Sequence, residues 1–402
     1  MREGNMRGHI VKRGKNSYSI VISLGKDTTT GKYKYQWETV KGTKKEAEKR
    51  LTELLHQIDT GTYMKPAKTT LAEFLQRWLR DYVWPNLAPR TAEGYDSIIR
   101  QHLIPGIGAI PLIKLHPEQL QRYYSEKLAN GRCDGQGALG RTTVSHHHTC
   151  LHRALSMALK WGLISRNPAD AVTPPRPQRS EIQTMNENEV QTFLKVAKET
   201  PYYAVFYLAL FTGMRRSELL ALRWCDVDLD MCEISVTRSL HLLRDRTISI
   251  QQPKTARARR QVALPPSATL MLKEYKEQQA LEYSMLGVSL EDDGLLFCQH
   301  DGRPLLPDSV SHAWVKIVKR AGLKHFRMHD ARHTHASLLL KQNVHPKVVQ
   351  ERLGHATIST TLDLYSHVAP GLQEAAARHF DEAFNPEYND IDKVTAGNEA
   401  DE

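Results

Sequence analysis

Near the middle of the chain lies a segment that cannot belong to a folded core. It contains three prolines and no large apolar side chain, and it reads Thr173-Pro174-Pro175-Arg176-Pro177-Gln178-Arg179. Proline fixes the torsion φ and removes a backbone donor, so such a segment is typical of a stiff linker. The 402 residues are also too many for one ordinary domain. The sequence therefore predicts two or three folded units, with a boundary at this linker.

The first 65 residues predict a small sheet backed by one helix. Ser17–Leu24 and Lys32–Val40 are rich in β-branched and aromatic residues that partly alternate with polar ones. From Thr43 onward the apolar residues recur at helical spacing, and Thr43 with Glu46 fits a capping box. We therefore expect a three-stranded sheet within residues 8–40, with one face packed on a helix.

The rest of the chain predicts one helical and one mixed unit. Within residues 66–178, after a linker at Thr62–Lys68, helical periodicity marks 70–79, 91–102, 117–130 and 142–161. We expect residues 104–108 to close the second of these helices, and 130–140 to form a surface loop. Within residues 179–385, helices flank β-rich segments at 233–236, 247–250 and 261–264.

Together these patterns predict a multidomain fold that is mainly α with small β-sheets. Residues 1–65 would form the three-stranded sheet plus helix, 66–178 a helical bundle, and 179–385 a mixed α+β domain. Residues 386–402 are acidic and predict a flexible tail.

The charge distribution favours a polyanionic partner. The formal net charge of the whole chain is +10; the excess of Lys and Arg lies within the first 380 residues, whereas the last 22 residues are strongly acidic. Such a distribution fits nucleic acid, although a basic surface that merely aids solubility would look similar. The sheet face opposite the helix could then carry Lys and Arg into a DNA groove.

Composition also argues against other classes. No apolar run approaches the roughly 18 residues of a membrane span, and no signal-peptide core follows the basic N-terminus. The five cysteines are scattered without a Cys-x-x-Cys pair. That usage indicates a reducing cytoplasm and disfavours a cysteine zinc site.

Arg215 is the first candidate for chemistry. Thr212-Gly213 interrupts an apolar helix, and Arg215 begins the next one. A guanidinium fixed at a helix start can offer its planar fork to phosphate oxygens, and Glu218 at i+3 could hold it in place. The alternative is an ordinary exposed ion pair.

A second arginine shares a helical face with a histidine. His329 and Arg332 are three residues apart, so one could handle a proton while the other completes a phosphate clamp. A zinc site at His329, His333 and His335 is the rival interpretation. The residues between the first pair offer no glutamate base, and Arg332 would repel a dication. The run His146–His148 would point in three directions on a helix, which indicates helix surface.

Lys254 and Tyr365 could complete a transesterification site. Lys254 lies between the β-rich segments at 247–250 and 261–264, so we expect it on a hairpin loop, where it could protonate a leaving oxygen. Its basic segment Lys254–Arg260 could instead only contact the DNA backbone. Tyr365 follows His355 by ten residues. A phenol has an ordinary pKa of about 10, and two guanidiniums beside it would favour the phenolate.

In this order the motifs resemble those of tyrosine recombinases, specifically the integrases of conjugative transposons and temperate phages of Gram-positive bacteria. The resemblance covers residues 1–380. Its carriers are Thr212-Gly213-Met214-Arg215-Arg216-Ser217-Glu218, Pro253-Lys254-Thr255, His329-Asp330-Ala331-Arg332-His333-Thr334, Leu353-Gly354-His355 and Tyr365-Ser366-His367.

The resemblance implies a role for each of six residues. Arg215 and Arg332 would clamp the scissile phosphate, and Lys254 would be the general acid for the 5′-oxygen. His329 and His355 would assist by hydrogen bonding and proton handling. Tyr365 would form a 3′-phosphotyrosine, and neither a metal nor a nucleotide cofactor would be needed.

The resemblance also implies the partners. Residues 1–65 would bind arm-type DNA sites, and residues 66–178 with 179–385 would enclose the core site. The active form would be a homotetramer on double-stranded DNA at the bacterial nucleoid, with an excisionase and a host DNA-bending protein as accessory factors. Two alternatives remain: a type IB topoisomerase-like relaxase with the same chemistry, and a non-catalytic DNA-binding protein with a helix-turn-helix at residues 345–366.

Overall fold

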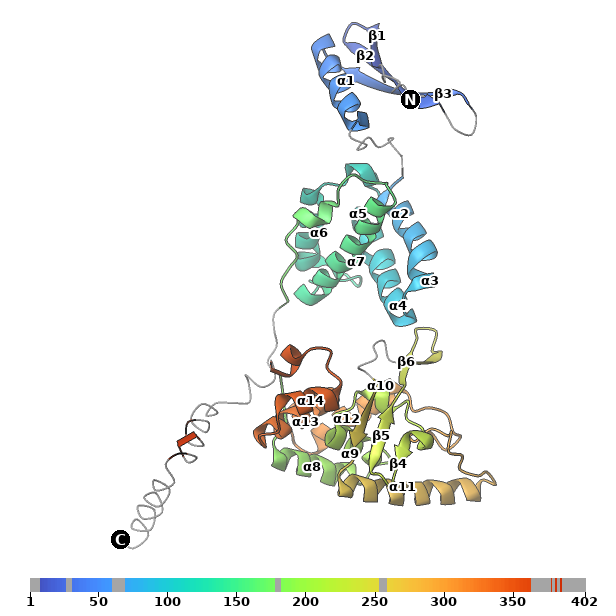
Figure 1. The fold of residues 1–402 in the computed structure, drawn as a ribbon, viewed down its shortest axis with the longest axis vertical. Coiled ribbons are helices and arrows are strands. Elements are labelled where there is room, and N and C mark those ends of the chain that lie inside the picture. The colour runs from blue at the N-terminus through green and yellow to red at the C-terminus, as the bar shows by residue number, and fades with distance from the viewer. Residues whose placement is uncertain are drawn as a thin grey trace. The chain divides into compact units, whose positions relative to one another are not determined.

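The structure is a computed structural model of the 402-residue chain. It describes residues 8–26, 31–59, 69–177, 182–252 and 259–362, and positions 377, 380, 381 and 384. The chain divides into two compact units, residues 1–179 and 180–402 (Figure 1). The linker predicted at 62–68 and the tail predicted at 386–402 lie outside the described residues. The multidomain, mainly helical class with small sheets is confirmed.

The N-terminal region has the predicted three-stranded sheet and one helix. Strands β1 (Gly8–Gly14), β2 (Ser17–Lys26) and β3 (Tyr33–Lys41) are antiparallel in the order β1-β2-β3, and α1 (Lys44–Asp59) lies along one face (Figure 1). Ile20 and Ile22 pack against Leu54 of that helix. The capping box is confirmed, because Thr43 N–H donates to Glu46 Oε2 at 2.7 Å and Glu46 N–H donates to Thr43 Oγ1 at 3.3 Å.

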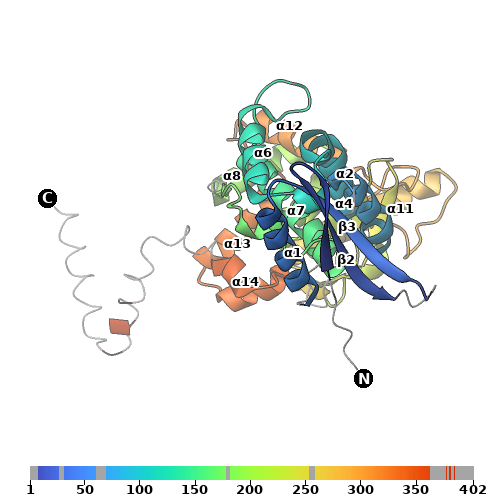
Figure 2. The same ribbon diagram turned by 90° about the horizontal axis from the view of Figure 1, so that it is seen from above.

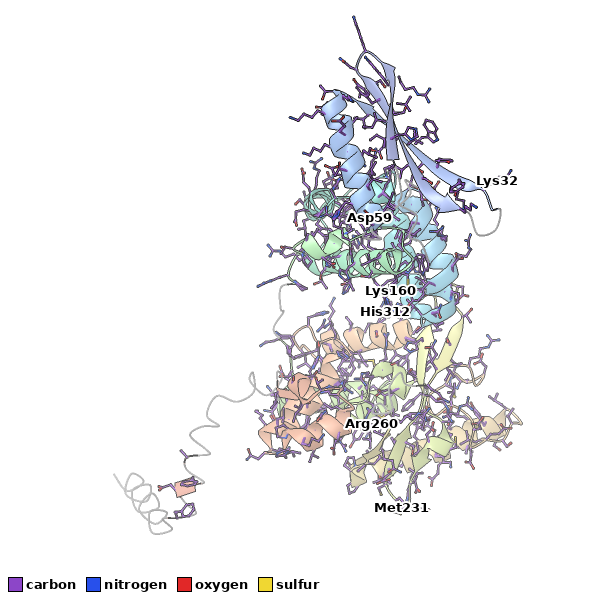
Figure 3. All side chains as sticks on the ribbon, turned by 45° about the horizontal axis from the view of Figure 1, so that its top comes forward. Lys32, Asp59, Lys160, Met231, Arg260 and His312 are labelled. Carbon is purple, nitrogen blue, oxygen red and sulfur yellow. The ribbon has the colours of Figure 1, made fainter. Side chains whose placement is uncertain are left out.

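The opposite face of this sheet carries the aromatic residues of β3. Tyr33, Tyr35 and Trp37 of β3 are each more than half exposed. The Arg13 guanidinium lies 5.6 Å from the centre of the Trp37 ring, and the Lys26 ammonium lies 5.3 Å from that of Tyr33. Cations are therefore present on this face, and they lie over the aromatic rings of β3. Lys32, the residue before β3, is labelled in Figure 3.

The helical region that follows is built around one apolar core. Its α-helices are α2 (Leu71–Trp78), α3 (Trp84–Asn86), α4 (Pro89–Ile98), α5 (Ile104–Ile107), α6 (Pro117–Asn130) and α7 (Arg141–Lys160), with 3₁₀ turns at Leu112–Lys114 and Pro168–Ala171. Trp78, Tyr123 and Leu155 are among the fully buried side chains of this core.

Two π turns join consecutive helices of this region. Leu79–Val83 links α2 to α3, and Ile99–Leu103 links α4 to α5. In each, the residue before a proline donates its N–H five residues back: Trp84 to Leu79, and Ile104 to Ile99. The wider turn accommodates a proline that would clash in a regular helix. Helical backbone therefore continues past the predicted end at residue 102 as far as Ile107, and it does end within residues 104–108, at the C-cap Gly108.

The three consecutive histidines of α7 are not all at the surface. His146 is exposed, but His147 is fully buried, with Nδ1 3.1 Å from the Tyr123 hydroxyl and its ring 4.6 Å from that of His102. The surface prediction was wrong for His147 because α6 packs on α7 and supplies the tyrosine. Burial first, and then the charge of His102, lowers the pKa of His147 to about 4.

The C-terminal unit mixes helices with two small sheets. Its helices are α8 (Glu187–Ala197), α9 (Tyr203–Thr212), α10 (Arg216–Leu219), α11 (Pro266–Met285), α12 (Pro307–Arg320), α13 (Asp330–Lys341) and α14 (Pro346–Leu353), with a 3₁₀ turn at Trp224–Asp226. Trp314 of α12 fills the core, with its ring 4.2 Å from Phe193 and 5.2 Å from Phe206. Helices α13 and α14 lie side by side (Figures 1 and 2).

The strands pair differently from the predicted hairpin. Strands β4 (Val227–Asp228), β5 (Glu233–Val236) and β8 (Arg260–Ala263) form one sheet, while β6 (Ser239–Leu242) pairs with β7 (Ile248–Gln251) in another. Among the described residues, β7 and β8 therefore belong to different sheets and do not pair as the predicted hairpin, while Lys254 itself lies outside the described residues. The reason is that β8 pairs with β5, where buried Ile234 lies opposite buried Val262.

No helix in the described part of the chain is both long enough and apolar enough to cross a membrane.

Candidate active site

A glycine at the end of α9 sets the direction of the chain at Arg215. Gly213 has a left-handed backbone with φ of 64°. A Cβ there would lie 2.6 Å from Leu353 and 2.7 Å from His335, so both the torsion and the close approach require glycine. Arg215 follows in an extended conformation as the N-cap of α10.

Arg215 is held by a buried carboxylate. Its Nη1 donates to Glu218 Oε1 at 2.8 Å, and its backbone N–H donates to Glu218 Oε2 at 2.9 Å. Glu218 is only 5% exposed, whereas the Arg215 side chain keeps 37% of its surface in solvent. The pair is therefore not an ordinary surface ion pair. Glu218 fixes one side of the guanidinium while part of it faces outward.

Arg332 is buried at the junction of three helix ends. It is 3% exposed, and its Nη1 and Nη2 donate to the carbonyls of Gly213 at 2.9 Å and Leu353 at 2.6 Å. Burial and the charge of Arg215 lower the pKa of Arg332 to about 9. That value leaves Arg332 charged at neutral pH. Gly213 precedes Arg215 by two residues, and Leu353 precedes His355 by two residues. Arg332 therefore binds the backbone directly before both of these side chains.

His355 follows the last turn of α14. Gly354 ends that helix with φ of 66°, and His355 Nδ1 lies 2.9 Å from Thr361 Oγ1, which orients the ring. Burial, followed by the charges of Arg332 and Arg215, lowers the pKa of His355 to about 3. His355 is therefore neutral at physiological pH in the free protein.

His329 is the N-cap of α13 and is reached by solvent. Its ring stands perpendicular to that of His333, with centroids 4.9 Å apart. Partial burial, His333 and Arg332 together lower the pKa of His329 to about 4. This histidine too is neutral in the free protein.

The zinc interpretation does not fit the third histidine. His335 Nδ1 lies 2.9 Å from the Leu210 carbonyl oxygen, and His335 Nε2 accepts from Arg352 Nε at 3.0 Å. Both ring nitrogens are therefore engaged, and His335 cannot join His329 and His333 around a dication. The described residues hold no group of three His, Cys, Asp or Glu side chains arranged for a metal.

The structure thus brings Arg215, Arg332 and His355 to one junction, with His329 at the start of the same helix as Arg332. Lys254 and Tyr365 lie outside the described residues. Sequence reasoning missed Arg260, which it included in a basic segment suited to the DNA backbone. Its side chain is instead 6% exposed and donates Nη2 to Glu218 Oε2 at 2.9 Å. The signal available was the alternation of β8, which predicts inward and outward side chains.

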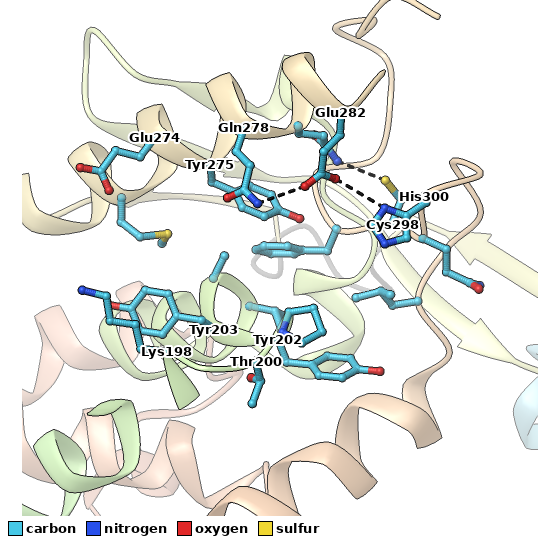
Figure 4. A pocket seen from close by; sticks show the side chains of 18 of the residues that line it. Lys198, Thr200, Tyr202, Tyr203, Glu274, Tyr275, Gln278, Glu282, Cys298 and His300 are labelled. Carbon is cyan, nitrogen blue, oxygen red and sulfur yellow. Dashed lines mark hydrogen bonds and ion pairs between the residues drawn. The ribbon is translucent and has the colours of Figure 1, made fainter. Parts of the chain in front are cut away.

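A large groove on the same unit is separate from this junction. It has a volume of about 730 Å³ and lies between α11 and the N-terminal end of α9. Figure 4 shows Lys198 and Tyr203 on one side of the groove, with Glu274 and Tyr275 on the other. It shares no residue with the predicted site. A duplex substrate requires an exposed basic surface, whereas Glu199, Glu274 and Glu282 line this groove, so we assign no part of the chemistry to it.

Comparison with known proteins identifies the family. The phage integrase family matches residues 183–371, and the N-terminal SAM-like domain of phage integrases matches residues 70–128. A tyrosine recombinase XerC-like protein of Caldanaerobacter subterraneus subsp. tengcongensis is 30% identical over 393 residues, which cover 93% of this chain and 98% of that protein. The chain belongs to the phage integrase family of tyrosine recombinases.

Solved structures support the same fold. The Tn1549 transposon integrase in complex with a circular intermediate DNA has a TM-score of 0.65 at 19% identity, covering 77% of this chain and 99% of the other. A lambda integrase tetramer bound to a Holliday junction has a TM-score of 0.54 at 18% identity, covering 88% and 94%.

Proposed function

We propose that this recombinase cuts and rejoins double-stranded DNA through a covalent bond to Tyr365, and so integrates and excises a prophage or a conjugative transposon. The observation that carries the proposal is the junction where Arg215 and Arg332 meet His355. A phosphodiester undergoing displacement develops charge on its non-bridging oxygens, and two fixed guanidiniums can stabilise that charge. A type IB relaxase is not favoured, because the family and the relatives are recombinases and integrases.

The proposed steps balance without an external energy source. Tyr365 attacks the scissile phosphorus as the phenolate that the two guanidiniums favour, the bond to the 5′-oxygen breaks, and the Lys254 ammonium gives a proton to that leaving oxygen. The product is a 3′-phosphotyrosine and a free 5′-hydroxyl. A 5′-hydroxyl of the partner duplex then attacks in the reverse sense and releases the tyrosine. One phosphoester replaces another at each step, so no ATP is consumed.

The histidines act as hydrogen-bonding groups in this scheme. His355 and His329 are neutral in the free protein, with pKa values of about 3 and about 4. A bound phosphate would offset the nearby cations and raise both values. Side chains fill every charge-stabilising role, so we expect EDTA to leave strand cleavage unchanged.

We also propose a division of labour along the chain. Residues 1–65 would bind arm-type sites, and residues 66–178 and 179–385 the core site. The tetrameric lambda integrase on a Holliday junction supports a homotetramer on DNA. Because chromosomal DNA is the target, we place the reaction in the bacterial cytoplasm at the nucleoid, with an excisionase and a host DNA-bending protein as accessory factors.

A nicked core-site duplex tests the chemistry. The nick lets the short 5′-product diffuse away, so the covalent intermediate accumulates and can be measured on a denaturing gel. We expect a protein–DNA adduct with this substrate and Holliday junctions with two intact attachment sites. An adduct accompanied only by relaxation of supercoiled DNA would instead identify a relaxase.

A truncation tests the arm-binding role. Removing residues 1–65 should abolish recombination of full attachment sites and spare cleavage of a short core site. The slope of log affinity against log salt on full sites should also flatten, by roughly 0.9 for each DNA phosphate that the truncated protein no longer neutralises. Recombination of full sites at the intact rate would contradict the assignment.

A further inference from the structure

Arg260 is buried beside the candidate active site, yet it belongs to none of the predicted motifs. It is the first residue of β8 and is labelled in Figure 3, inside the C-terminal unit. Its guanidinium forms a fork with the Glu218 carboxylate, at 3.3 Å from Nη1 to Oε1 and 2.9 Å from Nη2 to Oε2. The two side chains are each 6% exposed. A buried pair is costly to leave incomplete, so this geometry strongly constrains both groups.

The Glu218 carboxylate is fully occupied as a result. Each of its oxygens accepts one bond from Arg215 and one from Arg260. A carboxylate offers about four acceptor positions, and all four are used here. The orientation of Glu218, and therefore that of Arg215, depends on Arg260.

Arg260 also reaches the turn that precedes His355. Its Nε donates to the Arg352 carbonyl at 2.7 Å, in the last turn of α14. A Cβ on Gly354 would lie 3.1 Å from the Arg260 side chain, so the chain passes directly over it. One side chain thus links the carboxylate that holds Arg215 to the helix end that carries His355.

We propose that Arg260 is a positioning residue, which holds Arg215 through Glu218 and fixes that arginine relative to the turn of His355. The inference rests on the proposed function, because it concerns how the same phosphate site is assembled. Arg260 does not touch the phosphate in this scheme. It acts through the two elements that it joins.

The charges at the junction give Arg260 a second effect. Burial alone would raise the pKa of Glu218, but the hydrogen bonds and charge of Arg260, with those of Arg215, outweigh burial and keep the pKa below its ordinary value. Glu218 is therefore ionised, and Arg260 supplies a counter-charge to it. Without Arg260, Arg215 alone would have to balance the charge of the Glu218 carboxylate. The positive charge of Arg215 would then stabilise the phosphate less.

Two substitutions in the full chain test the proposal. Arg260→Lys keeps the charge but not the fork, and Arg260→Met removes both. With protein saturating on the nicked core-site duplex, we expect the single-turnover cleavage rate to fall roughly 10-fold for lysine and about 100-fold for methionine, because a small misplacement of a catalytic group can cost that much. The Kd for the duplex should stay within about 2-fold, since Arg260 contacts no DNA in this scheme.

The matched control is Arg238, whose Nη1 donates instead to the buried Asp226 at 2.6 Å. Arg238→Lys and Arg238→Met should keep the saturated cleavage rate within about 2-fold of wild type. The double variant Arg260→Met with Glu218→Gln should cleave little more slowly than either single variant, because the two residues act as one unit.

Each outcome bears on one proposal. If wild type forms no adduct, the proposed function fails. If wild type forms the adduct and Arg260→Lys, with an unchanged melting temperature, cleaves at the wild-type rate, the positioning role is overturned. A loss confined to Kd overturns it as well, because Arg260 would then be a DNA contact. Should Arg260→Met fail to fold, the lysine variant decides.

Discussion

Histidines with lowered pKa values occur in both units of the chain, but their surroundings differ. In the helical region, His147 is fully buried against the Tyr123 hydroxyl and the His102 ring, and burial is the main cause of its pKa of about 4. In the C-terminal unit, His355 is only half-buried, and the charges of Arg332 and Arg215 add to burial to bring its pKa to about 3.

This contrast shows that a depressed histidine pKa does not by itself mark a functional site. His147 completes a packed core, where burial contributes more to the lowered pKa than the nearby charges of His102 and Lys127. His355 lies where guanidiniums outnumber carboxylates, an arrangement that favours a phosphate. The surplus of fixed positive charge, and not the histidine, is what distinguishes the second site.

The largest expected effect concerns the nucleophile of the charged site. Tyr365→Phe should form no covalent adduct on the nicked duplex, while its Kd for DNA stays within about 2-fold, because only the hydroxyl is removed. Denaturing gels and a binding titration measure the two quantities. An adduct formed by the phenylalanine variant would mean that another tyrosine is the nucleophile.

The next effect separates the acid from the phosphate clamp. Lys254→Ala should slow cleavage of an ordinary phosphodiester by roughly 10²–10⁴-fold but spare a substrate with sulfur at the 5′-bridging position, because a thiolate leaves without a proton. Arg215→Ala should slow both substrates by roughly 10²–10³-fold, because it acts on the non-bridging oxygens. Equal damage to both substrates by Lys254→Ala would make it a backbone contact and leave His355 as the next candidate acid.

A pair of histidine substitutions tests the contrast between the units directly. His355→Ala should lower the saturated cleavage rate by roughly 10²-fold with a nearly unchanged free energy of unfolding. His147→Ala should do the reverse, lowering the free energy of unfolding by roughly 2–4 kcal/mol through a buried cavity and the loss of a hydrogen-bonding partner for Tyr123. Urea titrations give the free energy of unfolding of each variant, and single-turnover assays give its saturated cleavage rate. If both variants lost cleavage and neither lost stability, the contrast would be wrong.

Local chemistry was predictable from the sequence. The capping box of Thr43 and Glu46 depends on residues three apart, and so does the pair of Arg215 and Glu218. The glycine before Arg215 was correctly interpreted as a helix end. The resemblance placed Arg332 and His355 in one site, and the structure brings them to the same junction.

What the sequence did not reveal depends on contacts between distant residues. Arg260 lies 42 residues from Glu218, so a basic run next to Lys254 gave no sign that one of its members was buried. His147 meets a tyrosine 24 residues away, which converts an expected surface position into core. The pairing of β8 with β5, not with its sequence neighbour β7, likewise follows from which side chains the core accepts.

The smallest effect is a difference in the pH dependence of stability. His147 has an ordinary pKa of 6.5, and in the folded protein it falls to about 4, so the unfolded chain binds the proton more tightly. The free energy of unfolding should therefore decrease as the pH falls from about 6.5 toward 4, with roughly 2 kcal/mol of that loss between pH 7 and 5 due to His147. His147→Gln, which can still hydrogen-bond to Tyr123, should remove that part of the slope. The exposed neighbour His146 on the same helix is the control, and His146→Gln should keep the wild-type slope, as measured by urea titrations at pH 7 and pH 5. Equal slopes for the two glutamine variants would mean that burial does not hold His147 neutral. The contrast between a core histidine in the helical region and a charged-site histidine in the C-terminal unit would then be wrong.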